Sequence, residues 1–148
     1  MVIPQRVTSE LLEALCGTRL PVTMVLHCNH ANEIDEHLAA AVQLLKQAGI
    51  TLLNQAVLLK NVNDNIEDLL MLGETLGDHG VLPYYLHVLD HVKGAQHFHV
   101  DDQTAMKLAA EMLARLPGFL VPRLVREVAG ETSKTPLPTE HSMAHRLA

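Results

Sequence analysis

The sequence is short of cysteine, of net positive charge and of long apolar runs, and each shortage excludes a class of protein. Its only cysteines among 148 residues are Cys16 and Cys28, and the formal net charge is −6. An isolated cysteine pair without a secretory signal is typical of reduced thiols, so we expect a cytoplasmic location. The scattered acidic residues argue against nucleic-acid or anionic-membrane partners. No apolar run approaches the roughly 20 residues of a membrane span.

Apolar residues are abundant, and they fall into two kinds of segment that alternate along the chain. They make up 48% of the sequence, which predicts one compact domain with a sizeable core. Capping residues and glycines mark the ends of the expected helices. These helices cover residues 9–16, about 35–48, about 66–79 and about 102–116. The expected strands cover residues 22–26, 50–53 continuing through 56–59, 81–87 and 120–126.

The strands are continuously apolar, a pattern that favours a parallel sheet covered by helices on its outer face. A strand–helix unit recurs about every 30 residues, which indicates an α/β fold, either a barrel or a doubly wound sheet. Four such units are half of a complete β/α barrel. The chain also opens with a helix, as if the preceding strand were missing. We therefore expect half of a TIM-like barrel over residues 1–137, with a flexible tail over residues 138–148.

Polar residues follow each expected strand. In a parallel sheet these strand ends share one face, where active sites form. The sequence therefore predicts a small-molecule site there, with each of the four strand ends supplying a part. The residues are His27 after the first strand, Asn54 and Gln55 at the second, His87 and Asp90 at the third, and Arg123, Arg126, Glu127 and Lys134 at or after the fourth.

Each of these residues also has a purely structural interpretation. His27 could be a hydrogen-bonded core histidine, Asp90 could cap a turn, and Lys134 could be a solvated loop lysine. The chemical interest of Lys134 is that a deprotonated amine condenses with an aldehyde to a Schiff base. Its loop contains glycine and serine, whose N–H groups and hydroxyls can hold anions. The loop is not a complete phosphate-binding motif, because the first glycine and the following long helix are absent.

Several segments together resemble the lysine 2,3-aminomutases, in the same order and at similar spacing. They are residues 2–6, 29–34, 54–59, 83–85 and 133–136, and the resemblance extends to about residue 137. Residues 82–90, 94–95, 97–98, 121–122 and 134–137 are most similar to the branch of that family that β-lysylates elongation factor P.

The resemblance implies a radical S-adenosylmethionine isomerase that converts lysine to β-lysine with pyridoxal phosphate and a [4Fe-4S] cluster. Lys134 matches the lysine that binds pyridoxal phosphate. Asp90 and Glu127 match the two carboxylates that hold the substrate's ε-ammonium, with glutamate at position 127 where the family has aspartate. Gln55 and His27 match strand-end positions around the cofactors.

The largest departure from the family is the absence of its Cys-x-x-x-Cys-x-x-Cys motif. Cys16 and Cys28 lie twelve residues apart with no third cysteine, and cluster binding requires a close set of thiolates. We therefore expect a chain that lacks the first half of the barrel and is inactive alone. The alternative is a non-catalytic fragment, or a remnant that binds only pyridoxal phosphate or lysine.

Two further departures bear on the branch of the family and on partners. The free-lysine enzymes carry a cysteine where Asn65 stands and a cysteine cluster near the C-terminus, so their absence favours the elongation factor P branch. A half barrel also presents an unpaired apolar edge strand. We therefore expect self-association, or a partner chain that carries the first half of the barrel.

Overall fold

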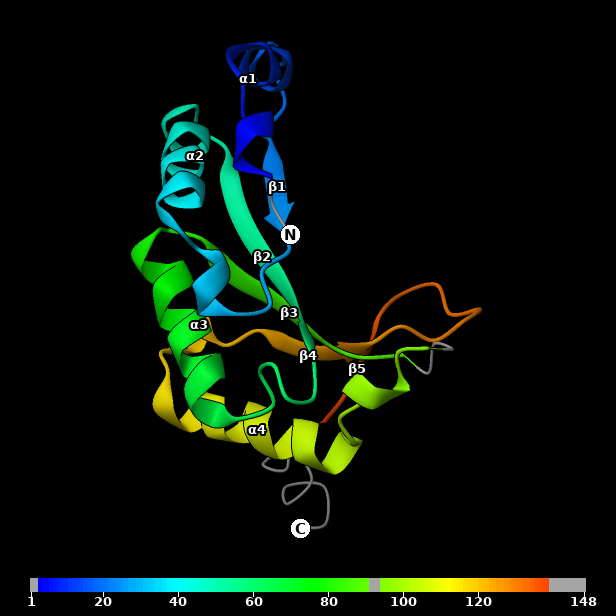
Figure 1. Ribbon diagram of the computed structural model, residues 1–148. Coiled ribbons are helices and arrows are strands. Elements are labelled where there is room, and N and C mark those ends of the chain that lie inside the picture. The colour runs from blue at the N-terminus through cyan, green and yellow to red at the C-terminus, as the bar shows by residue number, and fades with distance from the viewer. Residues whose placement is uncertain (1–2, 91–93, 139–148) are drawn as a thin grey trace.

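A five-stranded sheet with helices against one face forms the framework of the protein (Figure 1). The computed structural model describes residues 3–90 and 94–138. Within them, helices and strands alternate in chain order as far as the fourth strand, which the fifth strand follows directly. The helices are α1 (Ser9–Cys16), α2 (Glu36–Gln47), α3 (Ile66–Asp78) and α4 (Asp102–Arg115). The strands are β1 (Thr23–Leu26), β2 (Thr51–Leu58), β3 (Leu82–Val88), β4 (Arg123–Arg126) and β5 (Thr135–Pro136).

The strand order distinguishes between the two architectures that the sequence left open. Strands β1 to β4 are parallel and lie in the order in which they occur in the chain. A doubly wound sheet reverses its strand order and carries helices on both faces, whereas a barrel wall does neither. The sheet is therefore the wall of half a TIM-like barrel, as predicted.

Local signals set the helix boundaries. Asp35, Asn65 and Asp101 precede α2, α3 and α4, and each side chain accepts a hydrogen bond from the backbone N–H three residues later. Gly49 and Gly80 follow α2 and α3 with φ of +79° and +72°, a conformation that favours glycine. The four helices therefore lie where the sequence predicts them.

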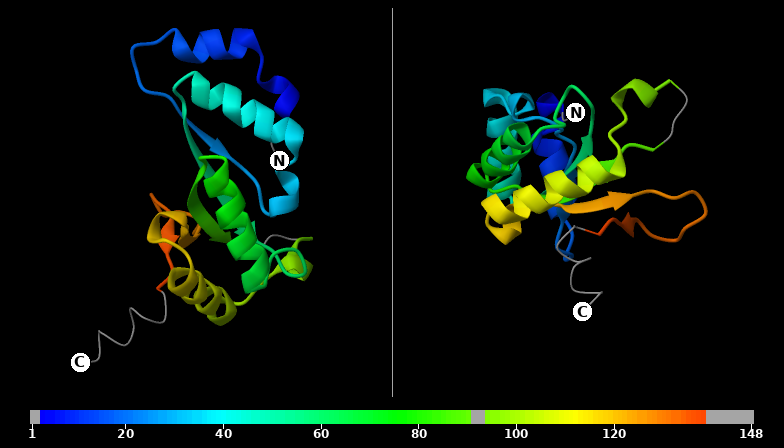
Figure 2. Two further views of the ribbon diagram at one scale, coloured as in Figure 1. Left: turned by 90° about the vertical axis from the view of Figure 1, so that its left-hand side faces the viewer. Right: turned by 90° about the horizontal axis from the view of Figure 1, so that it is seen from below.

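One expectation about the strands was wrong, and one strand was not predicted. β2 runs without interruption through Asn54 and Gln55, so these residues lie inside the strand and not at its end. Its register against β3 shifts between these two residues. In addition, the sequence pattern did not predict β5, a two-residue strand that pairs antiparallel with β4. The loop that joins β4 to β5 projects away from the helices (Figure 2).

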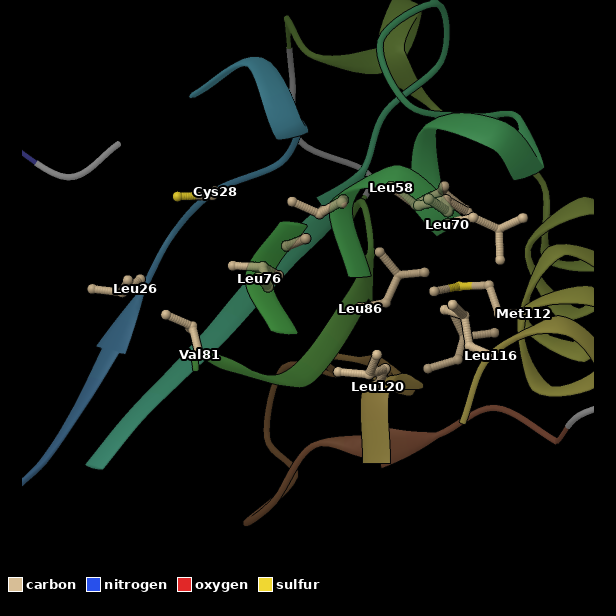
Figure 3. Packing of buried hydrophobic residues seen from close by; sticks show 14 of the residues in the cluster. Leu26, Cys28, Leu58, Leu70, Leu76, Val81, Leu86, Met112, Leu116 and Leu120 are labelled. Atoms are coloured by element: carbon tan, nitrogen blue, oxygen red, sulfur yellow. The ribbon is translucent and has the colours of Figure 1, made fainter. Parts of the chain in front are cut away.

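The two faces of the sheet differ in burial. On the face toward the helices, leucine and valine side chains from the strands pack against α3 and α4, as Figure 3 shows for Leu58 and Leu86 of the strands and Met112 of α4. The opposite face, which we call the inner face, has no covering layer among the described residues. There Val25 and Leu82 remain 37% and 43% exposed. The inner face is where a complete barrel would have its interior.

Two sequence expectations concern the rest of the chain. Within residues 3–90 and 94–138, none of the helices combines the length and apolar character required to cross a membrane. The flexible tail predicted from residue 138 lies, from residue 139 onward, outside the described residues.

Candidate functional site

Residues from neighbouring strands form a row across the inner face. Gln55 of β2 is in register with Tyr85 of β3, and Tyr85 with Arg123 of β4. His27 lies one residue beyond the paired Leu26 of β1. The Gln55 Nε2 lies 3.0 Å from the His27 Nε2. An amide nitrogen only donates, so this ring nitrogen is the acceptor.

His87 lies in the next row, two residues further along β3. Its ring meets the Tyr85 ring edge-on at 5.7 Å between centroids. Its Nε2 is buried and has no hydrogen-bond partner among the described residues. Burial is the main cause that lowers the pKa of His87, and the positive charge of Lys134 adds to it, whereas Glu127 and Asp90 oppose the shift. A neutral imidazole with an unused polar atom therefore lies in the middle of the inner face.

Lys134 is brought to this face by the short strand β5. The antiparallel register pairs Arg126 with Thr135, which makes Glu127 and Lys134 the next cross-strand pair. Their side chains form an ion pair, and the Lys134 Nζ lies 5.6 Å from the centre of the Tyr85 ring. The hydrogen bond from Lys134 is the main cause that lowers the pKa of Glu127.

Three adjoining grooves connect these groups, and Glu127 lines all of them. One groove is lined by His27, Gln55, His87 and Asp90 as well as Glu127. Another contains Lys134 together with loop residues of the β4–β5 connection. The five residues that the resemblance singled out therefore lie around one connected, open surface at the inner face.

Two other polar residues that the sequence placed at strand ends turn away from this surface. Arg126 pairs with Asp102 of α4, with 3.0 Å between Nη1 and Oδ2. Asn54 is buried on the helix-facing side. Sequence reasoning placed His87 at a strand end but assigned it no role, and it missed Tyr85. The alternation of side chains along β3 is the signal that could have found both.

Buried asparagines hold the segment that follows His27. The Asn54 side chain accepts from the N–H of Cys28 at 2.9 Å and donates to its carbonyl at 3.0 Å. Asn63 accepts from the N–H of Leu59 at 2.7 Å and donates to the carbonyls of Asn29 and Val57 at 2.8 and 2.9 Å. These contacts fix the end of β1 against β2, and with it the base of the His27 side chain.

The cysteines do not fit an iron–sulfur cluster. Cys16 is exposed and donates to the carbonyl of Ala48 at 3.4 Å, whereas Cys28 is buried. Burial, assisted by the Glu33 carboxylate, raises the pKa of the Cys28 thiol to about 11. Cluster ligands must be thiolates. The described part of the chain also contains no group of three metal-binding side chains.

The residues at the inner face fit a cofactor with a carbonyl group and an aromatic ring better than the cysteines fit an iron–sulfur cluster. Lys134 offers an amine beside the Tyr85 ring, and its groove is also lined by the hydroxyl-bearing residues Thr132 and Ser133. The unpartnered Nε2 of His87 is a buried polar atom that lacks a hydrogen bond in the protein alone. These are groups that can receive an aldehyde, a ring and an anionic substituent.

The depressed pKa of His87 leads to a pH-dependent stability. The pKa in the folded chain lies below the ordinary value of 6.5, so the unfolded chain binds more protons between the two values. The free energy of unfolding should therefore be fully maintained above pH 6.5 and fall as the pH drops through the folded pKa. NMR titration of the His87 ring should give a midpoint below 6.5, and His87→Phe should reduce the loss of stability seen in acid urea unfolding. A midpoint at or above 6.5 would contradict the burial argument.

Comparisons with known proteins agree with this picture. No protein-family model matches the chain. It is 51% identical over 137 residues to an L-lysine 2,3-aminomutase of Escherichia coli. The aligned residues make up 93% of this chain and 40% of that protein. The L-lysine 2,3-aminomutase of Clostridium subterminale is 36% identical over 93% of this chain and 33% of its own length.

The likeness to a solved structure concerns the fold. A radical SAM methyltransferase from Sphaerobacter thermophilus superposes with a TM-score of 0.55 at 16% identity, over 79% of this chain and 37% of the methyltransferase. It supports the assignment of the sheet to part of a barrel. With relatives at 47–51% identity over nine-tenths or more of its residues, the chain is homologous to the L-lysine 2,3-aminomutases and matches a segment of about two fifths of their length.

Proposed function

We propose that this chain is the part of a lysine 2,3-aminomutase that binds pyridoxal phosphate covalently through Lys134. The observation that carries the proposal is the position of Lys134 at the inner face, paired with Glu127 and beside the Tyr85 ring. Relatives of this segment are named L-lysine 2,3-aminomutase, which supports the same reaction class here.

We further propose that Asp90 and Glu127 hold the side-chain ammonium of lysine. Both carboxylates line the same groove, and two carboxylates facing one ammonium form charge-assisted hydrogen bonds. Such a clamp at a fixed distance from the reacting end selects for side-chain length. The longer arm of Glu127, compared with aspartate, places the ammonium further from the β4 backbone.

The roles of the chain's own groups follow from their positions. When bound, pyridoxal phosphate supplies the electron delocalisation that amino-group migration requires. Lys134 provides the amine that attaches it, and the Tyr85 ring limits where the cofactor ring can lie. The neutral His87 offers its Nε2 to a polar atom of the ligand. Gln55 orients the His27 ring through their hydrogen bond, at the groove wall formed by β1 and β2.

Covalent trapping tests this proposal on the chain as it exists. Mixing the chain with pyridoxal phosphate should produce an absorbance band near the visible edge. Borohydride reduction followed by peptide mass spectrometry should place the pyridoxyl group on Lys134. Modification spread over surface lysines such as Lys107, which is 70% exposed, without preference for Lys134, would contradict the assignment.

The finer parts of the proposal concern the branch, the location and the partner. We propose the elongation factor P branch, on the resemblance of residues 82–90 and 134–137, and a cytoplasmic location. We also propose that another chain, or a second copy, covers the inner face, because β1 is an edge strand and Val25 on it is 37% exposed. Sedimentation as a monomer with a cooperative thermal transition would contradict the last point.

A second candidate function is a non-catalytic one, and the state of the thiols favours it. The raised pKa of Cys28 and the separate position of Cys16 leave no ligand set for the cluster that would cleave S-adenosylmethionine. A chain of this kind would bind pyridoxal phosphate or lysine without turnover. An assay for β-lysine after iron–sulfur reconstitution separates the two candidates, and we expect no turnover from this chain alone.

A further inference from the structure

We infer that the Lys134 ammonium stays ion-paired with the ammonium-binding carboxylate of Glu127 until a carbonyl compound attaches to Lys134. Attachment then frees the Glu127 carboxylate to bind an external ammonium. Binding of the aldehyde and of the cationic substrate is then positively coupled through one ion pair. The inference rests on the proposed function, because it takes Lys134 as the attachment point and Glu127 as part of the ammonium site.

The backbone makes this ion pair the resting arrangement. Glu127 and Lys134 flank the last paired residues of β4 and β5, Arg126 and Thr135, and their side chains therefore extend from adjacent positions of one antiparallel ladder. The Lys134 ammonium is held on the Glu127 Oε1. Because the two groups belong to one chain, Lys134 competes at an effective concentration on the order of millimolar or higher.

Attachment of a carbonyl compound removes this competitor. The ammonium of Lys134 first releases a proton, its nitrogen then bonds to the aldehyde carbon, and the aldehyde oxygen leaves as water. The nitrogen keeps at most one of the three N–H bonds it had as an ammonium, and it is tied to the carbonyl carbon. It can no longer serve as the full hydrogen-bond partner of Glu127.

The carboxylate that is released already faces the groove that a substrate would enter. The Glu127 side chain is 60% exposed whereas that of Lys134 is 29% exposed, and Glu127 lines the groove that also contains Asp90. After attachment, an external ammonium can therefore contact two carboxylates, those of Asp90 and Glu127, where before only that of Asp90 was available. By linkage, an ammonium bound there strengthens attachment of the aldehyde by the same factor.

The test uses a probe that cannot itself condense with an aldehyde, the tertiary ammonium N,N-dimethylbutylammonium. Its affinity for the full chain is measured by NMR titration with and without pyridoxal phosphate. We expect pyridoxal phosphate to increase the affinity about tenfold, within the usual range of coupling between two sites. Without pyridoxal phosphate, Lys134→Met should bind the probe about tenfold more tightly than the unaltered chain.

Control variants separate this inference from the proposed function. Adding Glu127→Gln to Lys134→Met should remove the gain, and Lys107→Met on the exposed side of α4 should leave the affinity unchanged. Equal probe affinity in Lys134→Met and the unaltered chain would overturn the inference. So would attachment of pyridoxal phosphate, visible in the absorbance band, with no change in probe affinity, although the proposed function would stand. A missing band would instead reject the proposed function.

Discussion

Replacing Lys134 by alanine should abolish the absorbance band and the covalent attachment of pyridoxal phosphate. The expected loss is complete, because attachment requires the amine itself and not merely a positive charge. Other lysines are in different surroundings: Lys46 donates to the carbonyl of His79 at 2.9 Å, and Lys107 lies on the exposed side of α4 near Glu111. Neither is close to an aromatic ring in a groove of the inner face.

The variant is expected to fold, which makes the loss interpretable. An ion pair as exposed to solvent as Lys134–Glu127 contributes little to stability, because water and salt screen it. Circular dichroism and the midpoint of urea unfolding should therefore differ little between Lys134→Ala and the unaltered chain. Lys107→Ala is the matched control and should keep the band. A band that survives in Lys134→Ala would show that another amine carries the cofactor.

Replacing Asn63 by leucine should unfold most of the chain. Leucine has a similar volume, but at the fully buried position 63 it leaves the part-buried N–H of Leu59 and the carbonyls of Asn29 and Val57 without the partners that Asn63 supplies. Each unsatisfied buried group costs about 1–3 kcal/mol. The sum is comparable with the roughly 5–15 kcal/mol that stabilises a typical domain.

The control for this prediction is the same change at an exposed asparagine. Asn32 is exposed, its backbone N–H donates to the His30 Nδ1, and its side chain makes no hydrogen bond to the described residues. Asn32→Leu should therefore shift the urea midpoint only slightly. Similar midpoints for Asn63→Leu and Asn32→Leu would mean that water replaces the asparagine contacts, and that the segment after β1 is less firmly held than the geometry indicates.

Local signals explain why the order of the elements was predictable. Capping side chains at Asp35, Asn65 and Asp101 act within three residues, so they can be read directly from the sequence. The uninterrupted course of β2 could not be read in this way. Asn54 is polar but is satisfied by the backbone of Cys28, a partner 26 residues away that only the folded chain supplies.

The candidate site was predictable to the extent that parallel strands bring their ends together. That rule placed His27, Asp90 and Glu127 near one another before the structure was known. It could not pair Glu127 with Lys134, because this contact depends on β5, which is too short to carry a hydrophobic pattern. The roles of Tyr85 and His87 likewise depend on which way the side chains of β3 point.

The short strand β5 also determines in which direction the sheet can grow. It runs backward along the outer edge of β4, and its Pro136 has no N–H to offer to a further neighbour. Among the described strands, β1 is therefore the edge better suited to hydrogen-bond to an additional strand. The two edges of the sheet therefore differ: β5 covers one, and β1 leaves the other open. An assembly that extends the sheet is expected to add its strand at the β1 edge.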